Sequence, residues 1–236
     1  MNTLFSHVCV VTMDDRMSVW TDAFVGVTDG KISYLSKHAP EEKPAQIIDA
    51  TGMVLMPGLI NCHTHLPMQL LRGYADDLKL QEWLNDYIFP REDRLDGRCV
   101  RAATTLAVAE CLKFGVTSVS DMYYFCDDIC DVIAKSGMKA NISRGTSMFL
   151  GDDFDFEKFP ACQELVTLKE KWHNYDGGRI KIEASIHAEY TSTYQPWDAL
   201  SEFCINEGIG MQVHVSETKL EHDQCVERYG LRPAQV

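Results

Sequence analysis

The pattern of hydrophobic and polar positions changes near Pro57. Before that point, short β-branched runs are separated by turn residues, and Asp29-Gly30 between two of the runs is typical of a tight hairpin turn. These runs predict a small β domain over residues 1–57 that is incomplete by itself and carries no catalytic residue. The predicted strands span residues 8–12, 23–27, 31–35 and 47–49.

After Pro57 the chain alternates between short apolar runs and longer segments with helical spacing. Val100, Ala103 and Ala107, for example, recur every three or four residues along one of these segments. Strict alternation of this kind implies a parallel sheet with right-handed crossovers. The predicted strands are 57–63, 116–121, 139–144, 180–186 and 210–215, the predicted helices are 96–114, 127–135, 156–173, 197–207 and 218–229, and a polar, aromatic connection covers 66–96.

Two α/β architectures satisfy this alternation, an open doubly wound sheet and a (β/α)₈ barrel. The segment 61–66 after the first strand contains no glycine, which argues against the phosphate loop of an open sheet. Residues with useful chemistry gather instead at the C-terminal ends of the strands, where a barrel carries its active site. They are His63, His65, Asp121, Arg144, His187 and His214. We therefore predict a TIM-type barrel, of which residues 58–236 hold only about the first five β/α units.

The first strand of this barrel ends in two histidines one residue apart. Because side chains alternate along a strand, His63 and His65 point to the same face and can share one metal ion. His214, near the end of the fifth strand, can add a third ligand and leave a position for water, whose pKa a metal lowers toward neutrality. The spacing alone leaves open that these histidines are structural.

Two further residues near the strand ends have more than one interpretation. Glu217, three residues after His214, could carry protons between a water and a leaving group, or could stabilise a helix start through the helix dipole. His187 could bind the metal, contact a substrate or be a hydrogen-bonded loop histidine. Lys181 lies at the start of its strand rather than at the end, so a metal-bridging modified lysine is not expected and one metal ion is favoured over two.

The composition limits the partners and the compartment. The chain carries 22 Lys and Arg against 35 Asp and Glu, a net charge of −13, which argues against nucleic acid and anionic membranes as partners. No apolar run approaches the ~20 residues that span a bilayer, and the N-terminus lacks the basic segment and cleavage site of a signal peptide. The nine cysteines are scattered without a Cys-x-x-Cys, as expected for free thiols in a reducing compartment. We expect a cytoplasmic protein.

Several segments together resemble the amidohydrolase superfamily. They are VLMPGLINCHTHLPMQLLRGYADDLKLQEWL, FPRED, FGVTSVSDMY, SRG at 143–145, IHAEYTS and HVSET. The likeness covers essentially the whole chain, and its Pro-Gly…His-x-His and His-x-x-Glu elements are highly specific to the superfamily. Within it, the chain resembles the branch of 5-methylthioadenosine/S-adenosylhomocysteine deaminases and triazine chlorohydrolases.

The resemblance implies metal ligands, a proton carrier and substrate contacts. The implied ligands of one divalent metal ion, zinc or alternatively iron, are His63, His65 and His214. Glu217 matches the carboxylate that moves protons. The implied substrate-binding residues are Glu92 for ribose hydroxyls, Arg144 for a carboxylate tail, His187 for the purine, and Trp83 in a pocket-lining segment.

The implied reaction is hydrolytic deamination, in which a metal-activated water attacks the amino-bearing carbon of an adenine nucleoside or a related N-heterocycle. A related chlorohydrolase or guanine-type deaminase would share the same site, and a homo-oligomer stays an open alternative. At Glu189 many relatives carry proline, which leaves the shape of that loop and the substrate open.

The family also uses a metal-binding aspartate on the eighth strand and a histidine on the sixth, and both would fall after Val236. We therefore expect that the chain is truncated and lacks full activity. The alternative to an enzyme is a non-catalytic fragment that binds a metal.

Overall fold

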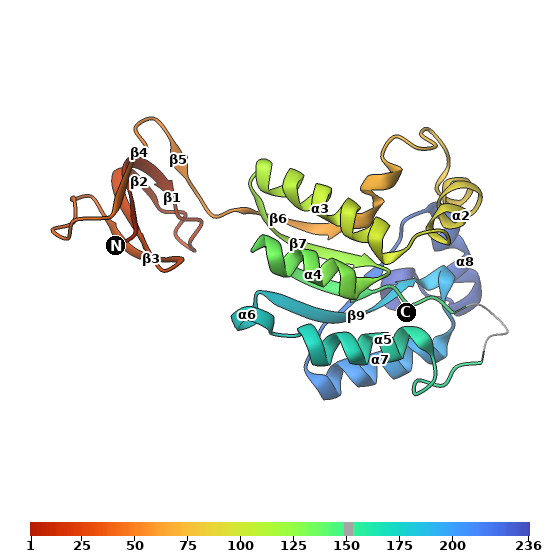
Figure 1. Cartoon of the computed structure of the whole chain (residues 1–236). Helices are drawn as coiled ribbons and strands as arrows, with labels where there is room; N and C mark the ends of the chain where they lie inside the picture. Colours follow the sequence, from red (N-terminus) through yellow and green to blue (C-terminus); the bar gives the residue numbers. More distant parts are fainter. Residues whose placement is uncertain (149–152) are drawn as a thin grey trace. The chain divides into compact units, whose positions relative to one another are not determined.

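A computed structural model of the chain describes residues 1–148 and 153–236. The chain divides into two compact units, Met1–Gly58 and Leu59–Val236, and Figure 1 shows the elements of each. The sequence placed this division one residue earlier, after residue 57. Among the described residues, no helix has the length and apolar character needed to cross a membrane.

The unit Met1–Gly58 is a five-stranded sheet. Its strands are β1 (Thr3–Val11), β2 (Val19–Thr28), β3 (Lys31–Ser36), β4 (Gln46–Asp49) and β5 (Val54–Leu55). The first three form an antiparallel meander, and β4 and β5 both pair with β1 in parallel. Asp29 and Gly30 have φ of 49° and 75° and form the predicted turn between β2 and β3, because a tight hairpin turn needs positive φ at both positions. A small core of Val8, Val25 and Ala50 holds the unit together.

The unit Leu59–Val236 is built on a second sheet of five strands, all parallel, in the order β10-β9-β8-β7-β6. They are β6 (Leu59–Thr64), β7 (Val116–Tyr123), β8 (Lys139–Arg144), β9 (Ile180–Ala188) and β10 (Met211–His214). Each bound lies within two residues of its predicted position. The prediction of an α/β arrangement with a parallel sheet is confirmed.

Helices pack against this sheet, and Figure 1 shows α3, α4, α5 and α7 running along one side of it. The helices are α3 (Gly97–Lys113), α4 (Cys126–Ser136), α5 (Pro160–Trp172), α6 (Tyr175–Gly178), α7 (Tyr194–Glu207) and α8 (Lys219–Tyr229). The predicted start of α5 at residue 156 was wrong. The helix begins at Pro160, because the fixed φ and missing N–H of proline suit the first helical position.

The connection between β6 and α3 contains more helix than the sequence predicted. It holds the 3₁₀ helix η1 (Leu66–Leu71), α1 (Leu80–Glu82), the π-helix η2 (Trp83–Ile88) and α2 (Phe89–Glu92). Two more 3₁₀ turns, η3 (Glu189–Thr191) and η4 (Pro233–Gln235), follow β9 and α8. These short elements carry no long helical repeat, so the periodicity of the sequence gives little sign of them.

The core lies between the sheet and its helices. Ile142 on β8 and Ile182 on β9 are fully buried, and they pack in one cluster with Ile129 of α4 and Leu165 of α5. Along Ile180–Ile186, apolar residues alternate with Lys181, Glu183 and Ser185, so one face of β9 packs into this core. This core makes the sheet a rigid support for the loops at the C-terminal ends of its strands.

Candidate active site

Three histidines converge although they come from opposite edges of the sheet. His63 and His65 lie at the end of β6, and His214 ends β10. A flat sheet would separate two strands four places apart by about 19 Å. The ring centres of His63 and His65 instead lie 4.9 Å and 5.1 Å from that of His214. The sheet is therefore curled, and each histidine offers a ring nitrogen within 4.8 Å of the others.

Hydrogen bonding and burial keep two of these imidazoles in the form that binds a metal. The Nδ1 of His65 lies 2.6 Å from the carbonyl oxygen of Met122. Because a carbonyl only accepts, Nδ1 must carry the proton, which leaves Nε2 free for a ligand bond. Burial and the neighbouring imidazoles lower the pKa of His214 to about 4, so its ring is neutral near pH 7.

Asp121 of β7 fixes the segment that carries the two histidines of β6. Its Oδ1 accepts hydrogen bonds from the Thr64 hydroxyl at 2.8 Å and the Leu66 N–H at 2.6 Å. The side chain is fully buried, which raises its pKa to about 7 despite these two donors. The sequence marked Asp121 only as a polar residue at a strand end, and the structure gives it a supporting position beneath the histidines.

A narrow inner pocket of about 80 Å³ opens beside the histidines. Glu217 lies in its wall, and the Tyr190 hydroxyl donates to Glu217 Oε2 at 2.9 Å. Trp83 and Phe89 give the pocket apolar walls. Its ionisable lining residues include His65, Glu92, His187, His214 and Glu217.

A wider outer cavity of about 470 Å³ shares Phe89, Glu92, Tyr124 and His187 with the inner pocket. At this boundary the Tyr123 hydroxyl donates to Glu92 Oε1 at 2.6 Å, and burial raises the pKa of Glu92. The two spaces are therefore adjacent, and Glu92 lines both of them.

His187 also lies at this boundary. Its Nδ1 is 3.0 Å from the Thr191 hydroxyl, and its ring is edge-on to that of His214 at 5.1 Å. Burial, first, and then the neighbouring imidazoles lower the pKa of His187 to about 4. His187 is not among the three histidines whose ligand atoms converge, so its position suits a contact with a bound molecule better than a ligand bond.

Arg144 lies in the outer cavity and already has partners within the protein. Its Nε donates to Glu164 Oε2 at 2.5 Å, and another guanidinium N–H donates to the carbonyl of Gly145. The guanidinium carbon also lies 4.8 Å from the ring centre of Tyr124. Of the eight residues to which the resemblance assigned a role, the structure thus places seven around these two adjacent spaces, and His63 lies in the histidine cluster.

The amidohydrolase family matches residues 54–234, which is most of the chain. The chain belongs to the amidohydrolase family. It is 32% identical over 233 residues to a 5-methylthioadenosine/S-adenosylhomocysteine deaminase of Thermoanaerobacter pseudethanolicus, covering 99% of this chain and 53% of that protein. It is 36% identical over 228 residues to a 5′-deoxyadenosine deaminase of Methanosarcina acetivorans, covering 96% and 52%. This amidohydrolase therefore spans about half the length of the curated relatives it matches.

Solved structures share the fold of this chain. A zinc-bound adenosine deaminase of Xanthomonas campestris is 30% identical with a TM-score of 0.88, covering 99% of this chain and 54% of that one. An atrazine chlorohydrolase of Arthrobacter aurescens has a TM-score of 0.87 at 21% identity, over 99% of this chain and 57% of that one. The second likeness shows the fold alone.

One residue that supports the site of this amidohydrolase was missed in the sequence. Glu221 on α8 is 1% exposed, and its carboxylate accepts the backbone N–H of Ser216 at 3.0 Å and that of Glu217 at 2.6 Å. Ser216 has φ of 59°, an uncommon conformation for a residue with a side chain. Thr218 and Glu221 form a capping box at the start of α8. The Thr-x-x-Glu spacing of a capping box is the sequence signal that could have revealed Glu221.

Glu189, at which the family resemblance predicts proline, forms an ion pair in which the carboxylate is buried and the partner is partly exposed. Its side chain is 4% exposed, and Arg228 of α8 donates to both carboxylate oxygens at 2.5–3.1 Å. The pair fixes the turn η3 against α8. Tyr190, the residue after Glu189, donates the hydrogen bond to Glu217. The shape of the loop after β9 is thus set by an ion pair between two residues that lie 39 positions apart in the chain.

Proposed function

We propose that the site of this amidohydrolase belongs to a metal-dependent hydrolase that deaminates adenine nucleosides of the methylthioadenosine or S-adenosylhomocysteine type. The observation that carries the proposal is the convergence of three imidazoles beside the inner pocket, whose wall also carries the carboxylate of Glu217. The names of the relatives support the substrate class. A guanine-type deaminase or a chlorohydrolase is the second candidate, since proteins with those names share the fold.

His63, His65 and His214 would hold one divalent metal ion. Zinc is our first choice because imidazole suits it and a zinc-bound relative shares the architecture, and iron is the alternative. The neutral state of His214 and the Nδ1 bond of His65 fit a metal, because both leave a ring nitrogen with a free lone pair. When bound, the ion supplies a water of lowered pKa.

Glu217 would move the protons of the reaction. With Oε2 held by the Tyr190 hydroxyl, Oε1 remains to accept a proton from the attacking water and to deliver it to the ring nitrogen. Neutral His187 would contact the ring, and Trp83 would exclude bulk water from it.

Glu92 would bind the ribose hydroxyls at the boundary between the two spaces. The Tyr123 hydroxyl donates a hydrogen bond to Oε1 of Glu92 and orients the carboxylate, which leaves Oε2 of Glu92 as an acceptor. A heterocycle in the inner pocket would then place its sugar beside Glu92 and its 5′ substituent in the outer cavity.

We also propose that the five strands are the first five β/α units of a barrel. For residues 1–236 alone we expect metal binding with negligible turnover. In the part of the chain that the structure describes, no carboxylate joins the three imidazoles as a fourth protein ligand. Robust ammonia release by this chain would contradict that expectation and leave the metal assignment intact.

The test combines metal content with ammonia release. The chain is prepared in zinc-containing buffer, desalted and assayed by elemental analysis, with about one zinc per chain expected. Ammonia release and equilibrium binding are then measured with methylthioadenosine, guanine and a triazine. Absence of bound metal would overturn the proposed metal site. Tighter binding of guanine or the triazine than of the nucleoside would overturn the proposed substrate class.

The role proposed for Glu92 gives a separate prediction. Glu92→Gln should weaken binding of adenosine to the zinc-loaded chain about tenfold, since a carboxylate bond to hydroxyls is charge-assisted, and should leave adenine within about twofold. Calorimetry measures both affinities, and Glu82→Gln, an exposed residue of α1, is the matched control. Equal losses for adenosine and adenine would reject the role.

A further inference from the structure

The outer cavity carries an excess of negative charge. Three carboxylates line it, those of Glu92, Asp93 and Glu164, against one guanidinium, that of Arg144. The only other ionisable side chain with a nitrogen in the described lining is His187, which is neutral near pH 7. Leaving Glu92 aside because it faces the sugar position, two carboxylates still oppose one cation.

The single cation of the cavity is already neutralised. The Arg144 side chain is 18% exposed, pairs with Glu164 through Nε, donates to Gly145 and stacks on Tyr124. An incoming carboxylate would have to displace Glu164 from a charge-assisted bond of 2.5 Å or approach it against like-charge repulsion. Asp93 has no ion-pair partner among the described residues and is exposed toward the solvent side.

These features decide which substituent the cavity accepts. We propose that the outer cavity selects nucleosides whose 5′ substituent is cationic or neutral, and that Glu164, by occupying Arg144, is the residue that disfavours an anionic one. The inference rests on the proposed function, because it takes the heterocycle to lie beside the histidines and the sugar beside Glu92. Of the two substrate types proposed above, it favours methylthioadenosine, whose 5′ substituent is neutral, over S-adenosylhomocysteine, whose 5′ substituent carries a carboxylate. It differs from the role that the family resemblance implied for Arg144, which was to bind a carboxylate tail.

The test compares three probes that differ only at the 5′ position. They are 5′-amino-5′-deoxyadenosine, 5′-deoxyadenosine and adenosine-5′-carboxylic acid, which are cationic, neutral and anionic near pH 7. Binding to the zinc-loaded chain is measured by calorimetry at low and high salt. We expect the amine to bind about tenfold more tightly than the carboxylate, with 5′-deoxyadenosine between them, and the ratio to shrink at high salt because salt screens the charges.

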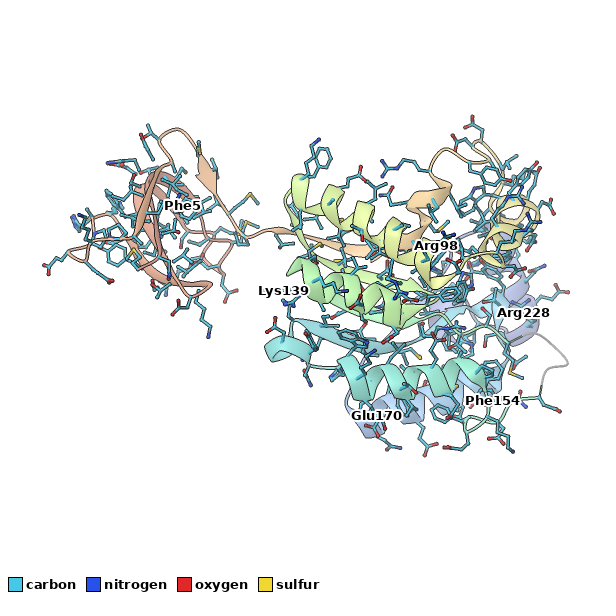
Figure 2. The ribbon with its side chains drawn as sticks, viewed as in Figure 1. Phe5, Arg98, Lys139, Phe154, Glu170 and Arg228 are labelled. Carbon is cyan, nitrogen blue, oxygen red and sulfur yellow. The ribbon has the colours of Figure 1, made fainter. Side chains whose placement is uncertain are left out.

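Variants of the cavity assign the effect to its residues. Glu164→Gln should release Arg144 and shift the amine-to-carboxylate ratio about tenfold toward the carboxylate. The matched control is Glu170→Gln, an exposed residue of the same helix α5, which is labelled in Figure 2 and should leave the ratio unchanged. Asp93→Asn leaves the ion pair of Arg144 intact and should weaken binding of the amine probe alone. This variant tests the charge selection if Glu164→Gln folds poorly.

The outcomes separate this inference from the function on which it rests. If 5′-deoxyadenosine binds and the carboxylate probe binds as tightly as the amine probe or more tightly, the charge selection is overturned and the proposed function stands. An unchanged ratio in folded Glu164→Gln would remove Glu164 from the explanation. Failure of all three probes to bind the zinc-loaded chain would overturn the proposed function and this inference with it.

Discussion

His63→Ala should abolish stable zinc binding by this chain. The three ring nitrogens lie within 4.8 Å of one another, and removal of one leaves two imidazoles from different strands with no third ligand among the described residues. Loss of an outer-shell partner alone typically costs 10–100-fold in metal affinity, so we expect a loss of at least about 100-fold for a direct ligand. Zinc retained after desalting should fall from about one per chain to below about 0.1.

The control for this prediction is His38→Ala. His38 is exposed and lies in the small β unit, and its hydrogen bonds to other described residues use its backbone alone. Its carbonyl accepts from the Tyr34 hydroxyl at 2.8 Å, and its N–H donates to the Ser36 hydroxyl at 3.1 Å. The variant therefore removes one imidazole without touching the site. Equal zinc content in His63→Ala and the parent chain would refute the ligand assignment, and equal loss in both variants would point to nonspecific binding.

The histidine pair shows how far the sequence can lead. Its spacing in a strand predicts a shared face, and the strand order places His214 near it. Convergence to ring distances of about 5 Å depends on the curl of the sheet, which no local pattern encodes. The sequence could therefore name the three histidines as candidate ligands but could not supply their geometry.

The partners of the site residues were harder to predict. Glu164 is 20 residues from Arg144, and Tyr190 is 27 residues from Glu217. Each pair depends on which helix or loop lies beside which strand end, so it is fixed by tertiary packing rather than by periodicity. The short helices before α3 were missed because single turns leave no repeat to recognise, and the start of α5 was missed because it is set by Pro160 at the first helical position.

Arg144 illustrates the consequence for function. The family resemblance implied that Arg144 binds a carboxylate tail, and the structure places Arg144 in the lining of the outer cavity. Its pairing with Glu164 changes the charge that a substrate would meet. Residue identity predicted the location, whereas the electrostatic character came from a partner that only the fold reveals.

Glu221→Ala should lower the free energy of unfolding by about 3 kcal/mol. The carboxylate is buried at the start of α8, where the helix dipole favours a negative charge, and it accepts the backbone N–H groups of Ser216 and Glu217. Hydrogen bonds to charged groups contribute about 1.5–3 kcal/mol each, and removal leaves these two donors, and the more distant Thr218 N–H at 3.4 Å, without their acceptor. Urea denaturation monitored by circular dichroism measures the change.

Two variants of the same helix and loop distinguish this role from a simple cap. Thr218→Ala removes only the hydroxyl that accepts the Glu221 N–H at 3.1 Å and should cost about 1 kcal/mol. Glu227→Ala, an exposed glutamate on α8, should change stability by less than about 0.5 kcal/mol. If Glu221→Ala cost no more than Thr218→Ala, the carboxylate would be an ordinary cap. A larger loss, together with weaker zinc binding, would show that it holds the loop between His214 and Glu217 in place, because that loop joins the proposed third metal ligand to the proposed proton carrier.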